Sequence, residues 1–186
     1  MPSSTGIWSQ EEAINHHVFD PNLALAIAGM FHENQQVIDI GCGLGTYCKF
    51  LHGRGFKVLG YEGTPGIREI AHYKDIVECD LTKAPSLPAV PQTMCLEVGE
   101  HIPKDYQNQF LDLIAQSTTE RAIISWAIPS QGGHGHVNER INSITSCRML
   151  MHDFYMNPEW TMTLRERASR PWFKHSLMVF DKWNRK

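Results

Sequence analysis

Short apolar runs alternate with amphipathic stretches along most of the chain. The apolar runs predict buried strands, and stretches with apolar residues three and four positions apart predict helices. The predicted strands span 36–40, 56–61, 75–80, 93–98, 121–128, 161–165 and 175–180. The predicted helices span 21–31, 46–54, 65–73, 104–117 and 140–155. Strands that alternate with helices are typical of a parallel α/β sheet.

The last two predicted strands, 161–165 and 175–180, are too close in sequence for a helical crossover between them. We therefore expect them to pair as an antiparallel hairpin, which makes the sheet mixed. No repeat or long linker divides the chain, so it is predicted to be one domain. Within it, we expect a helical segment at 1–35, a core at 36–129 and a region of loop, helix and hairpin at 130–186.

Composition and charge narrow the functional classes. The 186 residues are 42% hydrophobic and 20% charged, with a formal net charge of −3, which excludes a strongly basic nucleic-acid binder. The five cysteines are odd in number and include no Cys-x-x-Cys pair, which indicates a reducing, cytoplasmic location. We expect neither a signal peptide nor a membrane span, because the first residues lack an apolar run and no run reaches eighteen apolar residues.

A glycine cluster follows the strand at 36–40. Gly41, Gly43 and Gly45 stand between this strand and the next helix, where the backbone can turn sharply and approach a ligand. The dinucleotide fingerprint would need a glycine at Thr46, which disfavours a nicotinamide-dependent oxidoreductase. Glu62 ends the second strand, where it can accept ribose hydroxyls, and Asp80 closes the third, where it can accept an adenine amino group.

These ordered features resemble the class I S-adenosylmethionine-dependent methyltransferases over roughly residues 36–129. The resemblance implies a seven-stranded sheet of order 3-2-1-4-5-7-6, with strand seven antiparallel, in a three-layer α/β sandwich. It also implies S-adenosylmethionine as cofactor. Its methionine end would lie against Asp39, Gly41 and Gly43, its ribose on Glu62 and its adenine beside Asp80 and Leu81. The remaining predicted cofactor contacts are Cys42, Tyr47, Gly63 and Glu97.

The segment after the fourth strand carries Glu97, Glu100 and His101 in a Glu-x-x-Glu-His motif. Ubiquinone-pathway O-methyltransferases and small-RNA 3′-terminal methyltransferases use a similar motif to hold a divalent metal. Two carboxylates and an imidazole suit such an ion, and His134 or His136 could supply a further ligand, with His136 in the candidate site. Many class I methyltransferases carry this motif without binding a metal. We therefore expect that this protein binds no metal at the motif, and a metal site is the alternative. RNA is disfavoured as a substrate, because the chain is too short for an added RNA-binding architecture.

A loop rich in glycine and histidine follows the fifth strand. In open α/β sheets such loops border the ligand crevice, so Trp126, His134 and Asn138 are predicted to contact substrate. His136 is the candidate general base, with His101 and Glu100 as further catalytic candidates. The alternative is that the histidines and Asn138 brace the loop or cap the next helix.

Two peripheral segments leave their roles open. Trp8, His16-His17 and Phe19 either fold over the pocket as a lid or pack against the sheet. Near the other end, basic residues surround Pro171-Trp172 as a solvated edge or as a clamp for an anionic substrate; they are Arg165, Arg167, Arg170, Lys174 and His175.

Together these features predict an enzyme that transfers a methyl group from S-adenosylmethionine to a small molecule or an exposed terminal group. O-methylation is favoured over N-methylation, because Glu100, His101 and His136 could activate a hydroxyl. One alternative is metal-assisted O-methylation through the Glu-x-x-Glu-His motif. Another is a non-catalytic S-adenosylmethionine-binding partner or regulatory subunit. No membrane partner is expected, and nothing in the sequence indicates an oligomeric state.

Overall fold

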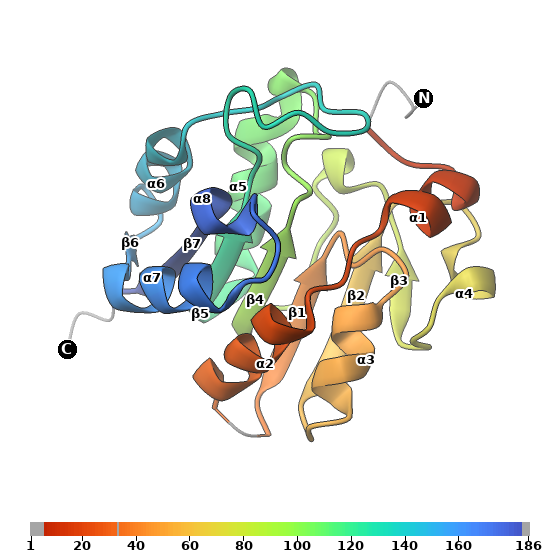
Figure 1. Cartoon of the computed structure of the whole chain (residues 1–186), viewed down its shortest axis with the longest axis horizontal. Helices are drawn as coiled ribbons and strands as arrows, with labels where there is room; N and C mark the ends of the chain where they lie inside the picture. The colour runs from red at the N-terminus through yellow and green to blue at the C-terminus, as the bar shows by residue number, and fades with distance from the viewer. Residues whose placement is uncertain (1–5, 33, 184–186) are drawn as a thin grey trace.

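The computed structural model describes residues 6–32 and 34–183, and a seven-stranded sheet runs through them. Its strand order is β3-β2-β1-β4-β5-β7-β6, with β7 antiparallel to both neighbours (Figure 1). The predicted order and mixed sheet are confirmed. The strands are β1 (Gln36–Ile40), β2 (Lys57–Glu62), β3 (Ile76–Glu78), β4 (Val90–Leu96), β5 (Thr118–Ser125), β6 (Phe154–Met156) and β7 (Leu177–Lys182).

Helices cover both faces of the sheet. The N-terminal helices are α1 (Gln10–His16) and α2 (Pro21–Met30), followed by α3 (Thr46–His52) and α4 (Ile67–Ile70). The later helices are α5 (Gln107–Gln116), α6 (Asn142–Leu150), α7 (Pro158–Arg167) and α8 (Phe173–Ser176). Short 3-10 turns, η1 (Leu81–Lys83) and η2 (Lys104–Tyr106), follow β3 and precede α5. No helix in the described part of the chain is long and apolar enough to cross a membrane.

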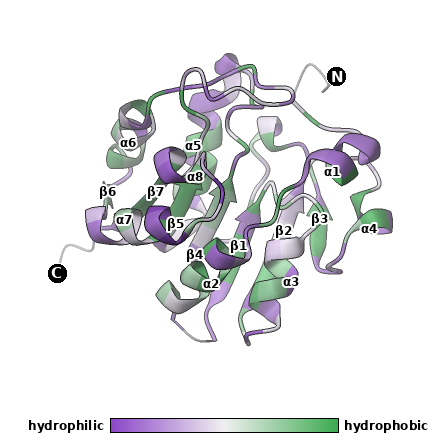
Figure 2. Ribbon diagram, viewed as in Figure 1, coloured by the Kyte–Doolittle hydropathy of each residue, from purple (hydrophilic) through white to green (hydrophobic). Residues whose placement is uncertain are grey.

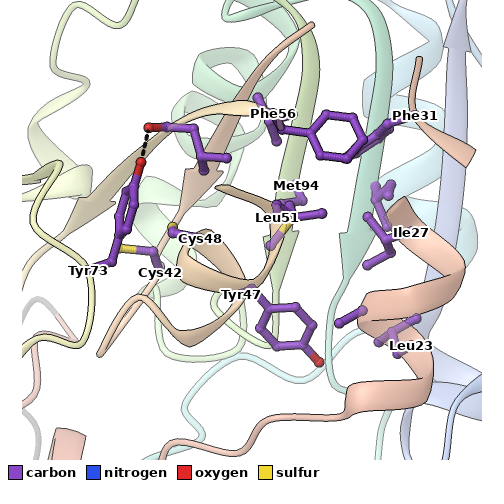
Figure 3. Packing of buried hydrophobic residues seen from close by; sticks show 14 of the residues in the cluster. Leu23, Ile27, Phe31, Cys42, Tyr47, Cys48, Leu51, Phe56, Tyr73 and Met94 are labelled. Carbon is purple, nitrogen blue, oxygen red and sulfur yellow. Dashed lines mark hydrogen bonds between the residues drawn. The ribbon is translucent and has the colours of Figure 1, made fainter. Parts of the chain in front are cut away.

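The core consists of two apolar clusters, one on each face. Helices α2, α3 and α7 pack on one face, and α5 and α6 pack on the other. Alternate residues of a strand serve the two clusters, as Val37 and Ile38 of β1 do. Figure 3 shows the first cluster, in which Leu23 and Ile27 of α2 face Tyr47 and Leu51 of α3. In Figure 2 the central strands carry much of the apolar colour, whereas α1 and α8 are largely hydrophilic.

The structure corrects the prediction for the last quarter of the chain. The predicted strand at 161–165 is part of helix α7, and its place in the sheet is taken by β6. The predicted helix at 140–155 is correspondingly shorter, because α6 ends at Leu150. Strands β6 and β7 do pair antiparallel, but two helices connect them instead of a short turn.

Five parallel strands place their carboxyl ends along one edge of the sheet. β1 lies between β2 and β4, so the chain continues in opposite directions from the middle of the sheet. Such a reversal leaves a crevice beyond the carboxyl ends of the two central strands. The predicted cofactor positions all lie at these strand ends or in the segments that follow them.

Candidate active site

A cavity of about 610 Å³ opens at this edge of the sheet. Its floor is formed by residues at the ends of β1 to β4, and its walls by the 128–136 loop and the segment before α8. Residues 6–18 pass over it from the N-terminus. All the predicted cofactor-binding residues line it, together with Glu100, His101, His134 and His136. The structure therefore brings most of the predicted site residues together.

At the glycine cluster, the backbone beside the cavity has a conformation and a packing that only glycine allows. Gly41, Gly43 and Gly45 all have positive φ, at 74°, 51° and 70°, a conformation that side chains other than glycine rarely adopt. A Cβ atom at Gly41 would lie 2.4 Å from the Val98 side chain, and one at Gly43 would lie within the ring of His17. Larger residues are thus excluded at both positions by conformation and by space.

Glu62 and Asp80 stand at neighbouring strand ends. One oxygen of Glu62 accepts from the amide of Gly43 at 2.7 Å, and the other accepts from the amides of Gly63 and Thr64. These bonds fix the carboxylate at the cavity wall. Asp80 accepts from the amide and hydroxyl of Thr82 through one oxygen, and its second oxygen lies 3.6 Å from Lys83 Nζ. Both carboxylates therefore have defined orientations.

Asp39 is a buried acid with a single side-chain hydrogen bond among the described residues. Its side chain is buried, and the thiol of Cys48 donates to it at 3.4 Å. Burial raises the pKa of Asp39 to about 7, and the negative charge of Glu62 adds to this effect against the bond from Cys48. A cationic ligand beside Asp39 would lower that pKa and favour the ionised form.

Glu97 follows β4 with a positive φ of 54°, which is uncommon for a residue with a side chain. Its amide donates to Ser125 Oγ at 2.8 Å, and its carboxylate accepts from Gln131 Nε2 at 2.7 Å and Ser176 Oγ at 3.0 Å. Three separate segments thus hold this backbone conformation. Strained residues of this kind concentrate at functional sites.

Glu100, His101 and His136 form a compact cluster, with ligand atoms within 4.8 Å of one another. Glu100 is fully buried, and neither carboxyl oxygen has a hydrogen-bond partner among the described residues. His136 Nε2 lies 3.9 Å from Glu100 Oε1. Glu97 is not part of this cluster, because its oxygens are bonded to Gln131 and Ser176.

Hydrogen bonds orient both imidazoles in the same way. Nδ1 of His101 donates to the carbonyl oxygen of Gly135 at 3.2 Å, and Nδ1 of His136 donates to Glu139 at 3.1 Å. A ring that donates through Nδ1 presents Nε2 as a base or a metal ligand while it is neutral. Burial lowers the pKa of His101 to about 4, so this ring is neutral at pH 7. Burial and the nearby Glu97 raise the pKa of Glu100 well above its ordinary value.

Some residues of the N-terminal segment lie over the cavity and others pack in the core, which are the two roles that the sequence left open. Trp8, His16 and His17 line the cavity, whereas Phe19 packs against Tyr47 and Phe50 in the core. The Trp8 ring makes an edge contact with His101, at 4.9 Å between centroids. His16 stacks on His134 at 4.0 Å, and His134 Nε2 lies 3.0 Å from Glu12 Oε1. The segment is therefore joined to the 128–136 loop across the cavity.

Trp126 and Asn138 do not line the cavity, although the sequence suggested substrate contacts for both. Trp126 is 1% exposed, and its indole nitrogen donates to the carbonyl of Asn138 at 2.6 Å. The Asn138 amide donates to the carbonyl of Ile102 at 3.1 Å. These bonds brace the loop against the core, which is the alternative given for Asn138. Their placement does not support a role in binding substrate.

Two residues that fix Glu97 were not singled out from the sequence. Gln131 and Ser176 hold Glu97, and Ser176 is 79 positions away along the chain. From the predicted basic segment, Trp172 and His175 line the cavity, but no arginine or lysine does so among the described residues. Arg165, from the predicted basic segment, donates instead to the carbonyls of Leu177 and His175. The anionic-substrate clamp therefore has no cationic Lys or Arg facing the cavity.

No protein-family model matches the sequence, and no curated protein matches it either. The fold, in contrast, is shared with many solved structures. A TehB-like SAM-dependent methyltransferase from Corynebacterium glutamicum superimposes with a TM-score of 0.67 at 16% identity, over 92% of this chain and 91% of that one.

Two further solved structures show the range of proteins with this fold. Magnesium protoporphyrin IX methyltransferase from Synechocystis, solved with SAM bound, gives a TM-score of 0.63 at 16% identity, over 94% of this chain and 79% of that one. The [4+2]-cyclase SpnF gives 0.59 at 10% identity, over 86% and 79%. At sequence identities this low, the structural similarity shows the fold alone. The reaction has to be inferred from the residues of the site. The chain has the Rossmann-like fold of the class I SAM-dependent methyltransferases.

Proposed function

We propose that this protein is an S-adenosylmethionine-dependent methyltransferase that acts on a small-molecule acceptor, with a hydroxyl oxygen as the preferred acceptor atom. The observation that carries the proposal is one cavity in which two sets of residues meet. The glycine loop, Glu62 and Asp80 are positioned as a cofactor site, and Glu100, His101 and His136 lie beside it as a site for activating an acceptor.

The cavity residues fit the proposed cofactor. The positive φ of Gly41 and Gly43 lets the backbone turn sharply at the cavity edge, and Glu62 and Asp80 offer fixed acceptors for ribose hydroxyls and an adenine amino group. The buried Asp39 carboxyl accepts one hydrogen bond, from Cys48, so a cationic group bound nearby would stabilise its ionised form. Two similar folds were solved with SAM or S-adenosylhomocysteine bound, which supports the same choice here.

The chain's own residues would then align the acceptor and remove its proton. S-adenosylmethionine, when bound, supplies a methyl group made electrophilic by a positively charged sulfur. Nε2 of His136, left available by the Nδ1 bond to Glu139, would accept the proton of the acceptor hydroxyl. Trp8, Ile102 and Ile128 line the same cavity and exclude water from the attacking group.

Calorimetric titration with S-adenosylhomocysteine tests the cofactor assignment. We expect micromolar binding to the wild type and at least tenfold weaker binding to Asp80→Ala, because a hydrogen bond to a charged group contributes about 1.5–3 kcal/mol. Asp105→Ala, which removes an exposed carboxylate outside the cavity, is the matched control. A thermal melt of each variant separates lost binding from lost folding, since Asp80 also caps η1.

The wild-type result decides the proposal. Failure of the wild type to bind S-adenosylhomocysteine would contradict it. If binding is confirmed, transfer of labelled methyl from S-adenosylmethionine to a panel of phenols, catechols and primary amines tests the acceptor atom. Methylation of amines alone would contradict the preference for oxygen. Binding without transfer to any acceptor would favour a non-catalytic, cofactor-binding partner.

A metal-assisted form of the same reaction is the second candidate, and the donor set favours it. Glu100, His101 and His136 would hold the ion, through one carboxylate and two Nε2 atoms. The unpartnered Glu100 oxygens and the outward Nδ1 bonds of both imidazoles fit such a site. A divalent ion bound there would lower the pKa of an acceptor hydroxyl.

Manganese binding, measured by electron paramagnetic resonance, tests this site without any need for turnover. We expect one Mn²⁺ per chain in the wild type and at least tenfold weaker binding to Glu100→Gln. The variant should remain folded, because it removes a carboxyl that is costly to ionise in the core. Glu159→Gln, at an exposed position of α7, is the control. Equal Mn²⁺ binding by all three proteins would exclude the site.

A further inference from the structure

The basic side chains that line the cavity in the described part of the chain are all histidines. The cavity's acidic residues are Asp39, Glu62, Asp80, Glu97 and Glu100, and no lysine or arginine lines it among the described residues. The proposed cofactor nevertheless carries a carboxylate on its methionine part. A carboxylate that leaves water for such a site requires hydrogen-bond donors to replace its hydration.

The glycine loop does not supply these donors at the positions where they would be expected. The amides of Gly41 and Cys42 both donate to the carbonyl of Tyr61, at 2.8 and 3.1 Å. The amide of Gly43 donates to Glu62 at 2.7 Å. All three donors are therefore already used within the protein. A side chain that reaches this loop is therefore a candidate for binding the carboxylate if the methionine part lies against it.

His17 lies at that position. Its ring occupies the space over Gly43, where an added Cβ would lie 1.3 Å from Cε1 and 1.9 Å from Nδ1. The Nδ1 atom is buried and has no hydrogen-bond partner among the described residues. In the tautomer that carries its proton on Nδ1, His17 therefore offers an N–H donor at the glycine loop.

The surrounding segment fixes His17 in this place. Helix α1, which ends at His16, begins with a capping box formed by Ser9 and Glu12. The Gln10 side chain donates to the carbonyls of Pro65 and Gly66 on one side of the cavity. Beyond His17, the amide of Asp20 donates to the Tyr47 hydroxyl at 3.1 Å. Both ends of the crossing segment are anchored.

We propose that the imidazole of His17 binds the carboxylate of the cofactor's methionine part, and so acts as a positioning residue for the methyl donor. This inference depends on the proposed function, because it requires the cofactor to bind in this cavity. It assigns the N-terminal crossing segment a defined task. The segment selects ligands that carry the carboxylate, and it holds the sulfur end of the cofactor toward Glu100 and His136.

Two ligands that differ only in the carboxylate test the proposal by calorimetry. S-adenosylhomocysteine carries it, and S-adenosyl-3-thiopropylamine lacks it but retains the amine. We expect the wild type to bind the first at least tenfold more tightly. In His17→Ala this preference should disappear, through weaker binding of S-adenosylhomocysteine alone, and His17→Gln should restore part of it because the amide is a donor. His32→Ala, at an exposed position outside the cavity, should keep the full preference.

A wild-type measurement accompanies the variants, so the result does not depend on how they fold. The imidazole NMR signals of His17 should shift with S-adenosylhomocysteine and not with the decarboxylated ligand. The role of His17 would be overturned if His17→Ala kept the tenfold preference, or if it lost affinity for both ligands equally. Either result would leave the proposed function intact. Absence of S-adenosylhomocysteine binding to the wild type would overturn both.

Discussion

At pH 8, Asp39→Asn is expected to unfold at a higher temperature than the wild type and to bind S-adenosylhomocysteine at least tenfold more weakly. Asp39 is 3% exposed, and its only hydrogen bond among the described residues comes from the Cys48 thiol. Ionising such a group in the unliganded protein costs free energy, which its raised pKa of about 7 reflects. The asparagine side chain avoids this cost but loses the charge that suits a cationic ligand.

The pH dependence follows from the direction of this shift. The folded-state pKa is above the ordinary value of 3.8, so the contribution of Asp39 to the free energy of unfolding is largest below pH 4. That contribution is lost as the pH rises through about 7. The gain in Asp39→Asn should therefore increase between pH 5 and pH 8 and reach up to about 4 kcal/mol. In the wild type, affinity for S-adenosylhomocysteine should increase over the same interval.

Urea unfolding and calorimetry at pH 5, 6, 7 and 8 provide the measurement. Asp181→Asn is a useful control, because Asp181 pairs with Arg121 at 2.5 Å and accepts from Asn157. Its replacement should lower stability rather than raise it. A lower stability of Asp39→Asn than of the wild type at pH 8 would mean that the carboxylate is a structural acceptor. An unchanged affinity would remove Asp39 from the proposed cofactor site.

The sequence was most informative where the determinants are local. The strand that ends at Ile40, the glycines after it and the acids at the ends of the next two strands are each visible within a few residues. Their order along the chain predicted the edge at which the cavity lies, whereas the order of the strands in the sheet followed from the resemblance to the class I methyltransferases. Local turn chemistry and strand periodicity suffice for such features.

Local signals were misread in the last quarter of the chain. Alternation of apolar and polar residues at 161–165 suggested a strand, but Asn157 and Pro158 just before it are an N-cap and a first-turn proline. The Asn157 side chain accepts from the amide of Trp160 at 3.0 Å, which fixes the start of α7. Capping residues therefore outweighed a short alternation that fits either type of element.

Other parts of the site depend on contacts that no local pattern encodes. Ser176 bonds Glu97 from 79 positions away, and His17 reaches the glycine loop only because α1 crosses the cavity. The sequence likewise does not show that Trp126 lies outside the cavity lining, because its partner, the Asn138 carbonyl, is a backbone group whose position depends on the loop's path. Such contacts arise from tertiary packing, and only the folded chain reveals them.

Asp20→Ala is expected to lower the free energy of unfolding by about 3–5 kcal/mol, because Asp20 is an acceptor shared by two segments of the chain. One carboxylate oxygen accepts from the amides of Asn22 and Leu23 at 3.1 Å each, and caps helix α2. The other accepts from the amides of Ser169 and Arg170, at 2.6 and 2.9 Å. Alanine leaves four backbone donors without this acceptor in a buried location.

The charge state of Asp20 gives the prediction a pH signature. Burial acts to raise its pKa, but the bonds from the four amides outweigh it and hold the pKa below its ordinary value of 3.8. A lowered folded-state pKa means that the stabilisation is present above pH 4 and is lost as the pH falls through that lower value. The difference between wild type and Asp20→Ala should therefore be constant from pH 5 to 8 and decrease in stronger acid.

Urea unfolding of the wild type, Asp20→Ala and Ser9→Ala measures this effect against a second helix cap. Ser9 caps only α1, at an exposed position, so its loss should cost about 1 kcal/mol. Equal effects of the two substitutions would contradict the role of Asp20 as a shared acceptor. The residues that it joins matter for the cavity as well, because Ser169 and Arg170 precede Pro171 and Trp172 in its wall. We therefore expect Asp20→Ala to weaken ligand binding even at temperatures where the variant remains folded.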